Sequence, residues 1–155
     1  MEAALAELET ALGHEFARQE LLVRALTHRS LVHEQAANNG GEKPVAEVAG
    51  DYERLEFLGD AVLGLVVGEA LFIAHPDWQE GELTRVRAQL VSRQHMAEVA
   101  AAISLGDHLR LSRGEDRGGG LRRKSTVLSN SMEAVMAALF LDGGLEPVRA
   151  LRSVG

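Results

Sequence analysis

Apolar residues recur at spacings of three and four positions along almost the whole chain. This period places them on one side of an α-helix, whereas a half-buried strand would need strict alternation. Ala and Leu, which favour helices, are abundant, and runs of β-branched residues are scarce. The sequence therefore predicts an all-α fold, and its 155 residues are the usual length of a single domain spanning residues 1–155.

The predicted helices are separated by turns and by two longer irregular regions. The helices cover about residues 1–12, 18–33, 51–75, 80–94, 95–103 and 125–141. Pro76 is expected to end the third helix, and Ser125 or Thr126 is expected to cap the last one. Residues 35–44 and 107–124 lack periodicity and are rich in turn residues, so we expect surface loops there.

Composition restricts the class of protein. The chain has 16 Lys and Arg residues against 23 Asp and Glu residues, a formal charge of −7, which argues against a general nucleic-acid coat protein. The absence of cysteine excludes disulfides and zinc sites built on thiolates. No uninterrupted apolar run approaches about 20 residues, and neither end resembles a targeting segment. We therefore expect a soluble, cytoplasmic domain that engages no membrane.

An acidic stripe is predicted near the start of the 51–75 helix. Glu53, Glu56 and Asp60 are spaced i, i+3, i+7, so their side chains share one helical face. A solvated charged face is the simplest interpretation, but residues 61–68 are apolar all round and predict a buried helix. Like charges one turn apart at the mouth of a buried helix are tolerated when a cation lies between them. Arg54 is one candidate for that cation, and a bound metal ion is another.

A second polar pair is predicted on the 125–141 helix. Asn130 and Glu133 are spaced i, i+3 among residues that otherwise predict a core helix, so Glu133 needs a partner. If this helix crosses the acidic stripe, Glu56, Asp60, Asn130 and Glu133 would form a pocket lined only by oxygen ligands. Such a pocket suits Mg²⁺, with Mn²⁺ as a substitute, rather than zinc or copper.

The run Glu53-Arg-Leu-Glu-Phe-Leu-Gly-Asp-Ala-Val-Leu63 resembles the signature of the endonuclease domain of bacterial ribonuclease III. Further similar segments cover most of the chain: Ala25-Leu-Thr-His-Arg-Ser30, Glu80-Gly-Glu-Leu83, Arg87-Ala-Gln-Leu-Val-Ser92, Leu111-Ser-Arg-Gly-Glu115, Glu133-Ala134 and Leu139-Phe-Leu-Asp-Gly-Gly144. The resemblance implies a homodimer of all-helical subunits that hydrolyses double-stranded RNA during rRNA and mRNA processing. It implies products with 5′-phosphates and two-nucleotide 3′ overhangs. The double-stranded-RNA-binding domain of bacterial members is not expected within this chain.

The resemblance also assigns roles to residues. It implies that Glu56, Asp60, Asn130 and Glu133 bind the metal, with Asp60 and Glu133 the most critical for catalysis. Glu53 and Glu80 would line the same acidic valley, and Phe57 would insert into a socket of the partner subunit. No small-molecule cofactor is implied.

Asn130 departs from the family pattern, which usually has Asp at this position. Asn keeps one carbonyl oxygen but lacks the negative charge, so metal affinity is expected to fall. The chain is then a native variant that still cuts, a relaxed paralogue, or an engineered form that holds RNA uncut. The alternative function is accordingly that of a catalytically impaired module that binds RNA or assists assembly.

A basic segment lies within and after the second predicted loop. It includes Arg113, Arg117, Arg122, Arg123 and Lys124, which would contact the RNA backbone or would simply be solvated. His28 is interpreted as a helix histidine whose hydrogen bonds are satisfied within the fold. Aromatic residues make up only 4% of the chain, too few for a platform on which bases stack, so recognition of duplex shape and backbone is favoured.

Overall fold

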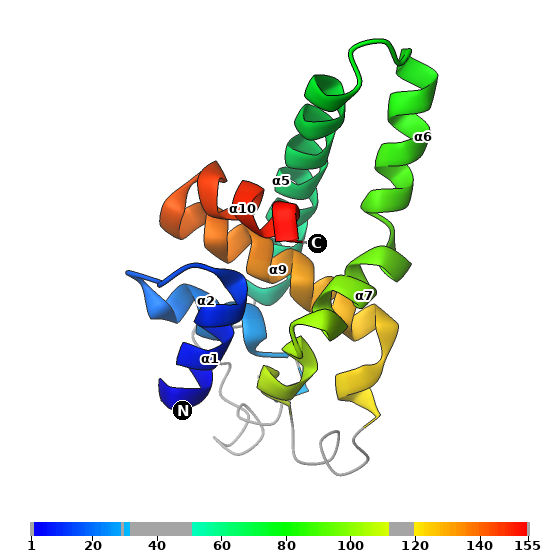
Figure 1. Cartoon of the computed structure of the whole chain (residues 1–155). Helices are drawn as coiled ribbons and strands as arrows, with labels where there is room; N and C mark the ends of the chain where they lie inside the picture. Colours follow the sequence, from blue (N-terminus) through cyan, green and yellow to red (C-terminus); the bar gives the residue numbers. More distant parts are fainter. Residues whose placement is uncertain (1, 29, 32–50, 112–119, 155) are drawn as a thin grey trace.

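The chain is almost entirely helical, as a computed structural model shows for residues 2–28, 30–31, 51–111 and 120–154 (Figure 1). The elements are α1 (Glu2–Leu12), α2 (Gln19–Leu26), α5 (Asp51–Ala74), α6 (Glu80–Leu90), α7 (Arg93–Ala102), the 3₁₀ turns η1 (Leu105–His108) and η2 (Leu121–Arg123), α9 (Ser125–Gly143) and α10 (Leu145–Val154). No β-strand longer than an isolated bridge occurs among these residues. The predicted all-α fold is therefore confirmed.

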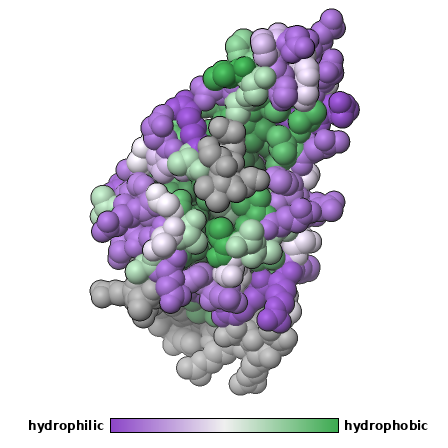
Figure 2. All heavy atoms as spheres, in the orientation of Figure 1, coloured by the Kyte–Doolittle hydropathy of each residue, from purple (hydrophilic) through white to green (hydrophobic). Residues whose placement is uncertain are grey.

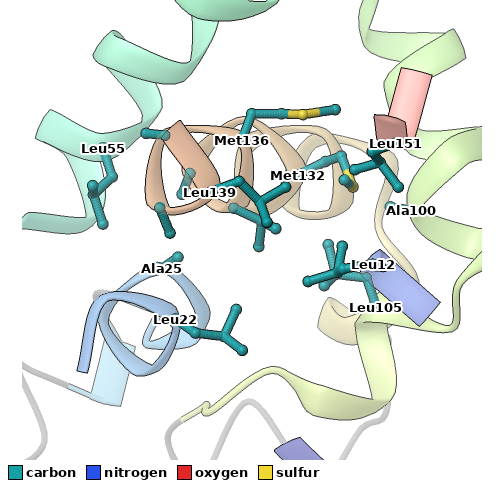
Figure 3. Close-up of a cluster of buried hydrophobic side chains, with 14 of the residues drawn as sticks. Leu12, Leu22, Ala25, Leu55, Ala100, Leu105, Met132, Met136, Leu139 and Leu151 are labelled. Carbon is teal, nitrogen blue, oxygen red and sulfur yellow. The ribbon is translucent and has the colours of Figure 1, made fainter. Parts of the chain in front are cut away.

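Helix α9 lies at the centre of the hydrophobic core. Its Met132 and Leu139 are fully buried, and Figure 3 shows side chains of neighbouring helices gathered around them. Leu22 approaches from α2 and Leu55 from α5, and both belong to the same buried cluster. Three alanines of α9 are completely buried as well: Ala134, Ala137 and Ala138. Their small side chains allow the surrounding helices to approach α9 closely.

Helices α5 and α6 form a hairpin that extends away from the rest of the molecule (Figure 1). Helix α5 ends at Ala74, directly before His75 and Pro76, so the predicted end of this helix is confirmed to within a residue. At the tip, the ring of His75 stacks on that of Trp78 with centroids 3.7 Å apart. Because α5 runs from the core to this tip, its first turns and its last turns lie in different surroundings.

Helix α10 was not expected from the sequence. Gly144, at φ +76°, takes a backbone conformation that favours glycine and lets the chain turn out of α9 into this new helix. Val148 of α10 is fully buried, and the guanidinium Nε of Arg149 donates to Glu69 on α5 over 2.9 Å. Gly143 and Gly144 thus end α9, and the chain continues directly into α10.

The turn between α1 and α2 is held by the carboxylate of Asp142 at the end of α9, a side chain that is 2% exposed. This carboxylate accepts hydrogen bonds from the backbone N–H groups of Ala17 and Arg18, at 3.0 and 2.9 Å, and pairs with His14 Nε2 at 2.7 Å. Burial acts to raise the pKa of Asp142, but these hydrogen bonds outweigh it and hold the pKa below its ordinary value. The N-terminal helices are thereby fixed to the C-terminal end of α9.

Helix α2 is shorter than predicted. The sequence predicts a helix to His33, but α2 ends at Leu26 and Thr27 is extended, with φ −89° and ψ 105°. Thr27 pairs with Arg110 in a parallel bridge, in which Arg110 N donates to Leu26 O and His28 N donates to Arg110 O, each over 2.9 Å. A segment more than 80 positions away in sequence thus takes the backbone groups that would have continued the helix.

Two other predicted boundaries are wrong. The predicted helix over 80–94 ends at Leu90, and Ser92 begins α7 by accepting a hydrogen bond from His95 N over 3.2 Å. At the start of α9, the capping position is Lys124 rather than Ser125 or Thr126, and no side chain caps the helix there. The predicted loop at 35–44 lies outside the described residues, as do residues 112–119 of the second loop.

Helix α5 is long and apolar enough to cross a membrane by length and composition alone, in contrast to the expectation from uninterrupted apolar runs. The core helix of a globular protein meets the same criteria, and Val62, Leu63, Val66 and Val67 of α5 are buried in the core. Figure 2 shows hydrophilic residues over much of the visible surface, with hydrophobic residues gathered between α5 and α6. The absence of a membrane partner stays a prediction.

Candidate functional site

A pocket of about 780 Å³ opens where the first part of α5 crosses α9. Five residues predicted for the site line it: Glu53, Glu56, Asp60, Asn130 and Glu133. The first three come from one face of α5 and the last two from α9, as their spacing predicts. The crossing of the two helices, which the sequence could only suggest, is therefore present.

Gly59 determines how closely the two helices approach. It is buried on α5, and a Cβ atom there would overlap the backbone carbonyl of Glu133 on α9. The backbone of α9 thus occupies the space that any other side chain at this position would need. This contact brings Glu133 beside Asp60, the next residue of α5, and beside Glu56 one turn earlier.

Glu133 has the most strongly perturbed carboxyl group of the site. Its burial, a hydrogen bond with Asp60 and the negative charges of Asp60 and Glu56 raise its pKa from 4.5 to about 7, while the charge of Arg93 opposes the rise. Near neutral pH, the Glu133 carboxyl group therefore carries a proton for part of the time.

The donor set fits a hard divalent cation. The carboxylates and the Asn130 carbonyl offer only oxygen atoms, which Mg²⁺ and Mn²⁺ prefer. Among the described residues, no three carboxylate or imidazole groups already stand together as a complete metal-binding cluster. Instead, the raised pKa of Glu133 favours its protonated form, which repels Asp60 less than a carboxylate would. A divalent cation in the proton's place would relieve the same repulsion, which makes these residues suitable ligands.

A polar shell supports the pocket from the side of α2. Tyr52 at the start of α5 hydrogen-bonds Ser131 of α9, with 3.0 Å between the two buried oxygens. His28 lies outside any named helix and lines the pocket, where its Nδ1 accepts a hydrogen bond from Ser30 N over 3.0 Å. The expectation of a helix histidine is therefore wrong, because the pairing of Thr27 with Arg110 ends α2 before His28.

The comparisons with known proteins agree with this arrangement. A family model described as Ribonuclease-III-like matches residues 18–153. The chain belongs to the ribonuclease III-like family. It is 48% identical over 145 residues to Ribonuclease 3 of Geobacter metallireducens, covering 94% of this chain and 55% of that protein. It is 47% identical over 149 residues to Ribonuclease 3 of Azotobacter vinelandii, covering 96% of this chain and 58% of that protein.

Solved structures place this ribonuclease III-like chain with the nuclease domain of the family. The nuclease domain of ribonuclease III from Campylobacter jejuni superposes with a TM-score of 0.79 at 37% identity, covering 96% of this chain and 92% of that one. That protein shows structural flexibility in a region involved in dimer formation. The present chain spans just over half the length of the curated relatives it matches. The resemblance deduced from the signature run is confirmed.

Phe57 lies beside the acidic face of this family member and is 80% exposed. It borders a second hollow of about 800 Å³, whose apolar lining includes Leu21, Leu58 and Leu141. An aromatic side chain with so much surface in solvent contributes little to the core of one subunit. Its role as a dimer anchor stays a prediction, and its exposure leaves it accessible to a partner.

Glu80 does not lie with the other acidic residues in a single subunit. It is the first residue of α6, beyond the tip of the hairpin, and it is absent from the described lining of the pocket. From Asp60 to the end of α5 at Ala74, the helix rises about 21 Å, which separates the two carboxylates. The family resemblance predicts that Glu80 lines the acidic pocket, but the length of α5 places Glu80 far from that pocket in one subunit.

The predicted basic residues occupy several different positions. Arg113 and Arg117 lie outside the described residues. The guanidinium of Arg122 donates to the backbone oxygens of Gly106 and Leu109, over 3.0 and 2.7 Å, and so links η2 to the segment around η1. Lys124 lines the acidic pocket, and Arg123 is exposed beside it.

The sequence analysis missed Arg93. Its charge acts on Glu133 although the two residues are 40 positions apart. Arg93 begins α7, which packs closely on α9, and this packing brings the two residues near each other. No spacing pattern links Arg93 to Glu133, and the predicted helix boundary at residues 94 and 95 does not place Arg93 at the start of α7.

Replacement of Gly59 by Ala should destabilise the crossing. The added Cβ meets backbone rather than a mobile side chain, so we expect the free energy of unfolding to fall by about 1–3 kcal/mol. Gly81→Ala is the matched control, because a Cβ there meets open space and should be neutral or stabilise α6 by up to about 1 kcal/mol. Urea denaturation of both variants measures the difference, and equal midpoints would contradict the assigned role of Gly59.

Proposed function

We propose that the chain hydrolyses phosphodiester bonds of double-stranded RNA with the help of Mg²⁺ held in the pocket between α5 and α9. The observation that carries this proposal is the contact between Asp60 and Glu133, whose carboxyl groups are forced together in a pocket also lined by Glu56 and Asn130. Membership of the ribonuclease III-like family supports the same reaction class. Processing of rRNA and mRNA precursors in the cytoplasm is the corresponding expectation for the cell.

The residues of the pocket divide the chemical tasks. Asp60, Glu133 and Glu56 offer carboxylate oxygens to the cation, and Asn130 offers its carbonyl. When bound, a divalent ion lowers the pKa of water and neutralises the charge that builds on the phosphate. The water oxygen bonds to phosphorus, the bond from phosphorus to the 3′-oxygen breaks, and that oxygen takes a proton. The products therefore end in a 5′-phosphate and a 3′-hydroxyl.

The surroundings of the pocket favour a duplex over a single strand. Of the Phe and Tyr rings in the described lining, Tyr52 is 5% exposed and hydrogen-bonded to Ser131, and Phe57 is the predicted contact with a second copy, so neither is offered to a base. Lys124 supplies a positive charge at the rim, where it can attract the RNA backbone. These features support recognition of backbone and shape, as for other proteins that bind double-stranded RNA.

We further propose that two copies associate through the exposed side of α5. Phe57, Leu65 and Phe72 are 80%, 57% and 71% exposed, and their spacing places them along one side of the helix. An apolar stripe of this kind is typical of a protein–protein interface. A twofold dimer carries two pockets, so each pocket can cut one strand of the duplex and leave the proposed two-nucleotide 3′ overhang.

The alternative is a catalytically impaired member of the family that binds RNA or assists assembly. It is favoured by one observation: the pocket holds Asn130, so the four predicted metal ligands Glu56, Asp60, Asn130 and Glu133 include three carboxylates and one uncharged amide. A weaker site would still bind metal at higher concentration. The two functions therefore differ in whether cleavage occurs once the cation is saturating.

Cleavage of a long RNA duplex tests the proposed function directly. With Mg²⁺ present, we expect cuts that leave 5′-phosphates and two-nucleotide 3′ overhangs, and chelation of the metal should abolish them. Glu133→Gln should lower the cleavage rate by at least about 100-fold, because it removes a negative charge and leaves only one carbonyl oxygen as a ligand for the cation. Blunt products or metal-independent cleavage would overturn the mechanism, and binding without cleavage at any Mg²⁺ or Mn²⁺ concentration would favour the alternative.

Asn130→Asp should strengthen the metal site. Adding one negative charge in the pocket is expected to lower the Mg²⁺ concentration for half-maximal cleavage about tenfold, equivalent to ~1.4 kcal/mol. Asn130→Ala, which removes the ligand oxygen without adding charge, should raise that concentration instead. A Mg²⁺ titration of cleavage compares the three proteins. Identical half-maximal concentrations for the wild type and Asn130→Asp would exclude Asn130 as the source of weak binding.

Phe57→Ala should weaken the dimer. Truncation of a buried aromatic costs about 3–5 kcal/mol, so the dissociation constant should rise on the order of 100-fold or more. Ile73→Ala is the control: this residue is 70% exposed but projects about 160° around α5 from Phe57. Sedimentation at a series of protein concentrations measures both constants. An unchanged dimer in the Phe57 variant would rule out this residue as the anchor.

A further inference from the structure

A groove distinct from the hollow beside Phe57 adjoins the acidic pocket, and two arginines line this groove. This groove has a volume of about 500 Å³, and its polar lining consists of Arg93, Gln94, Glu98, Arg123 and Ser125. The chain segment at the start of α9 forms a wall shared by the two hollows. Arg123 and Ser125 line the groove, whereas Lys124 and Thr126 line the acidic pocket. A polymer that passes over the acidic pocket can therefore continue into the groove.

The side chains of Arg93 and Arg123 are free to contact a ligand. Both side chains are exposed, and neither has a hydrogen bond or ion pair with any residue that the structure describes. Arg93 is the first residue of α7, where a positive charge opposes the helix dipole. The helix already has a cap in Ser92, which accepts a hydrogen bond from His95 N. Arg93 therefore does not stabilise the N-terminus of α7, and its charge is available to bind an anionic ligand.

Binding of RNA across the acidic pocket requires positive charge beside the pocket. Glu53, Glu56, Asp60 and Glu133 all line it, and a divalent cation cancels only part of their charge. RNA carries a negative charge on every phosphate, so the remaining carboxylate charge repels the strand that must lie across the pocket. Cations directly beside the pocket offset this repulsion without entering the coordination shell of the metal. Arg93 lies close enough for its charge to act on Glu133.

We propose that Arg93 and Arg123 form a phosphate-binding subsite that holds the RNA backbone next to the bond to be cut. The guanidinium groups would each donate to phosphate oxygens of one strand, for which their planar fork of N–H groups is suited. Glu98 limits the positive charge of the groove, so the subsite holds the strand without trapping the product. This assignment rests on the proposed function, because it requires RNA to lie across the acidic pocket.

The test compares Arg93→Ala and Arg123→Ala with the wild type in cleavage of an RNA duplex at saturating Mg²⁺. Each variant should raise the RNA concentration for half-maximal rate about tenfold or more, because it removes a charge-assisted hydrogen bond. The slope of the logarithm of this concentration against the logarithm of KCl concentration should fall by about 0.9 for each phosphate that the variant no longer binds. The kcat should not change, since the arginine binds phosphate equally strongly before and during the reaction.

Two further variants separate phosphate binding from a structural role. Arg93→Lys keeps the charge, so it should retain most of the salt dependence. Arg18→Ala is the control, because it removes an arginine side chain far from the groove. The backbone N–H of Arg18 donates to Asp142 at the C-terminal end of α9. Along the helix, Asp142 lies about 26 Å from Ser125, which lines the groove. Arg18→Ala should change neither the half-maximal concentration nor the salt slope. Thermal denaturation should give the same Tm for all variants.

The possible outcomes distinguish this inference from the proposed function. If the wild type cuts the duplex but both alanine variants keep its salt slope, the subsite is wrong and the function stands. If Arg93→Ala lowers kcat without affecting RNA binding, Arg93 acts on Glu133 rather than on RNA, which also overturns the subsite. A wild type that neither binds nor cuts the duplex would overturn both.

Discussion

The close packing of α5 against α9 at Gly59 is the contact on which the rest of the structure depends. The two helices supply many of the buried side chains of the core. They also carry the five carboxylate and amide side chains of the acidic pocket: Glu53, Glu56, Asp60, Asn130 and Glu133. Burying the Glu133 carboxyl group beside Asp60 is electrostatically unfavourable, as the raised pKa of Glu133 shows. Burial of apolar side chains such as Met132 and Val66 in the core favours the crossing and offsets that repulsion. The site is therefore strained by charge and held by hydrophobic packing.

Negative and positive side chains are separated around the crossing of α5 and α9, which the net charge of the chain does not reveal. The chain is acidic overall, with a formal charge of −7, yet Arg93, Arg123 and Lys124 gather at one border of the acidic pocket. An acidic centre suits a cation, and a basic border suits a polyanion such as the RNA that we propose as the substrate. Arg122 belongs to the same stretch of sequence but joins η1 to η2 through backbone oxygens. Neighbouring basic residues thus divide between holding the fold and facing solvent.

Helix α5 joins three different surroundings. Its first turns carry the acidic face, its middle is buried against α9, and its last turns extend into the hairpin with α6 (Figure 1). Phe57, Leu65 and Phe72 remain exposed along one side, adjacent to the acidic face. A partner that covers this side would lie next to the acidic pocket, so dimer formation and catalysis would depend on the same helix. Phe57 and Asp60 lie three residues apart on this helix, so the proposed dimer contact and the proposed metal site are neighbours.

The helical class, the acidic face of α5 and the common face of Asn130 and Glu133 can all be predicted from the sequence. Each of these follows from helical periodicity, which is local and can be deduced from spacing alone. The end of α2, the break between α6 and α7 and the existence of α10 depended on tertiary contacts. Arg110 pairs with Thr27 across the fold, and Arg149 fixes α10 to Glu69. Only the tertiary structure separated Glu80 from the other carboxylates and placed Arg93 near Glu133, because the distance between residues on different helices depends on how those helices pack.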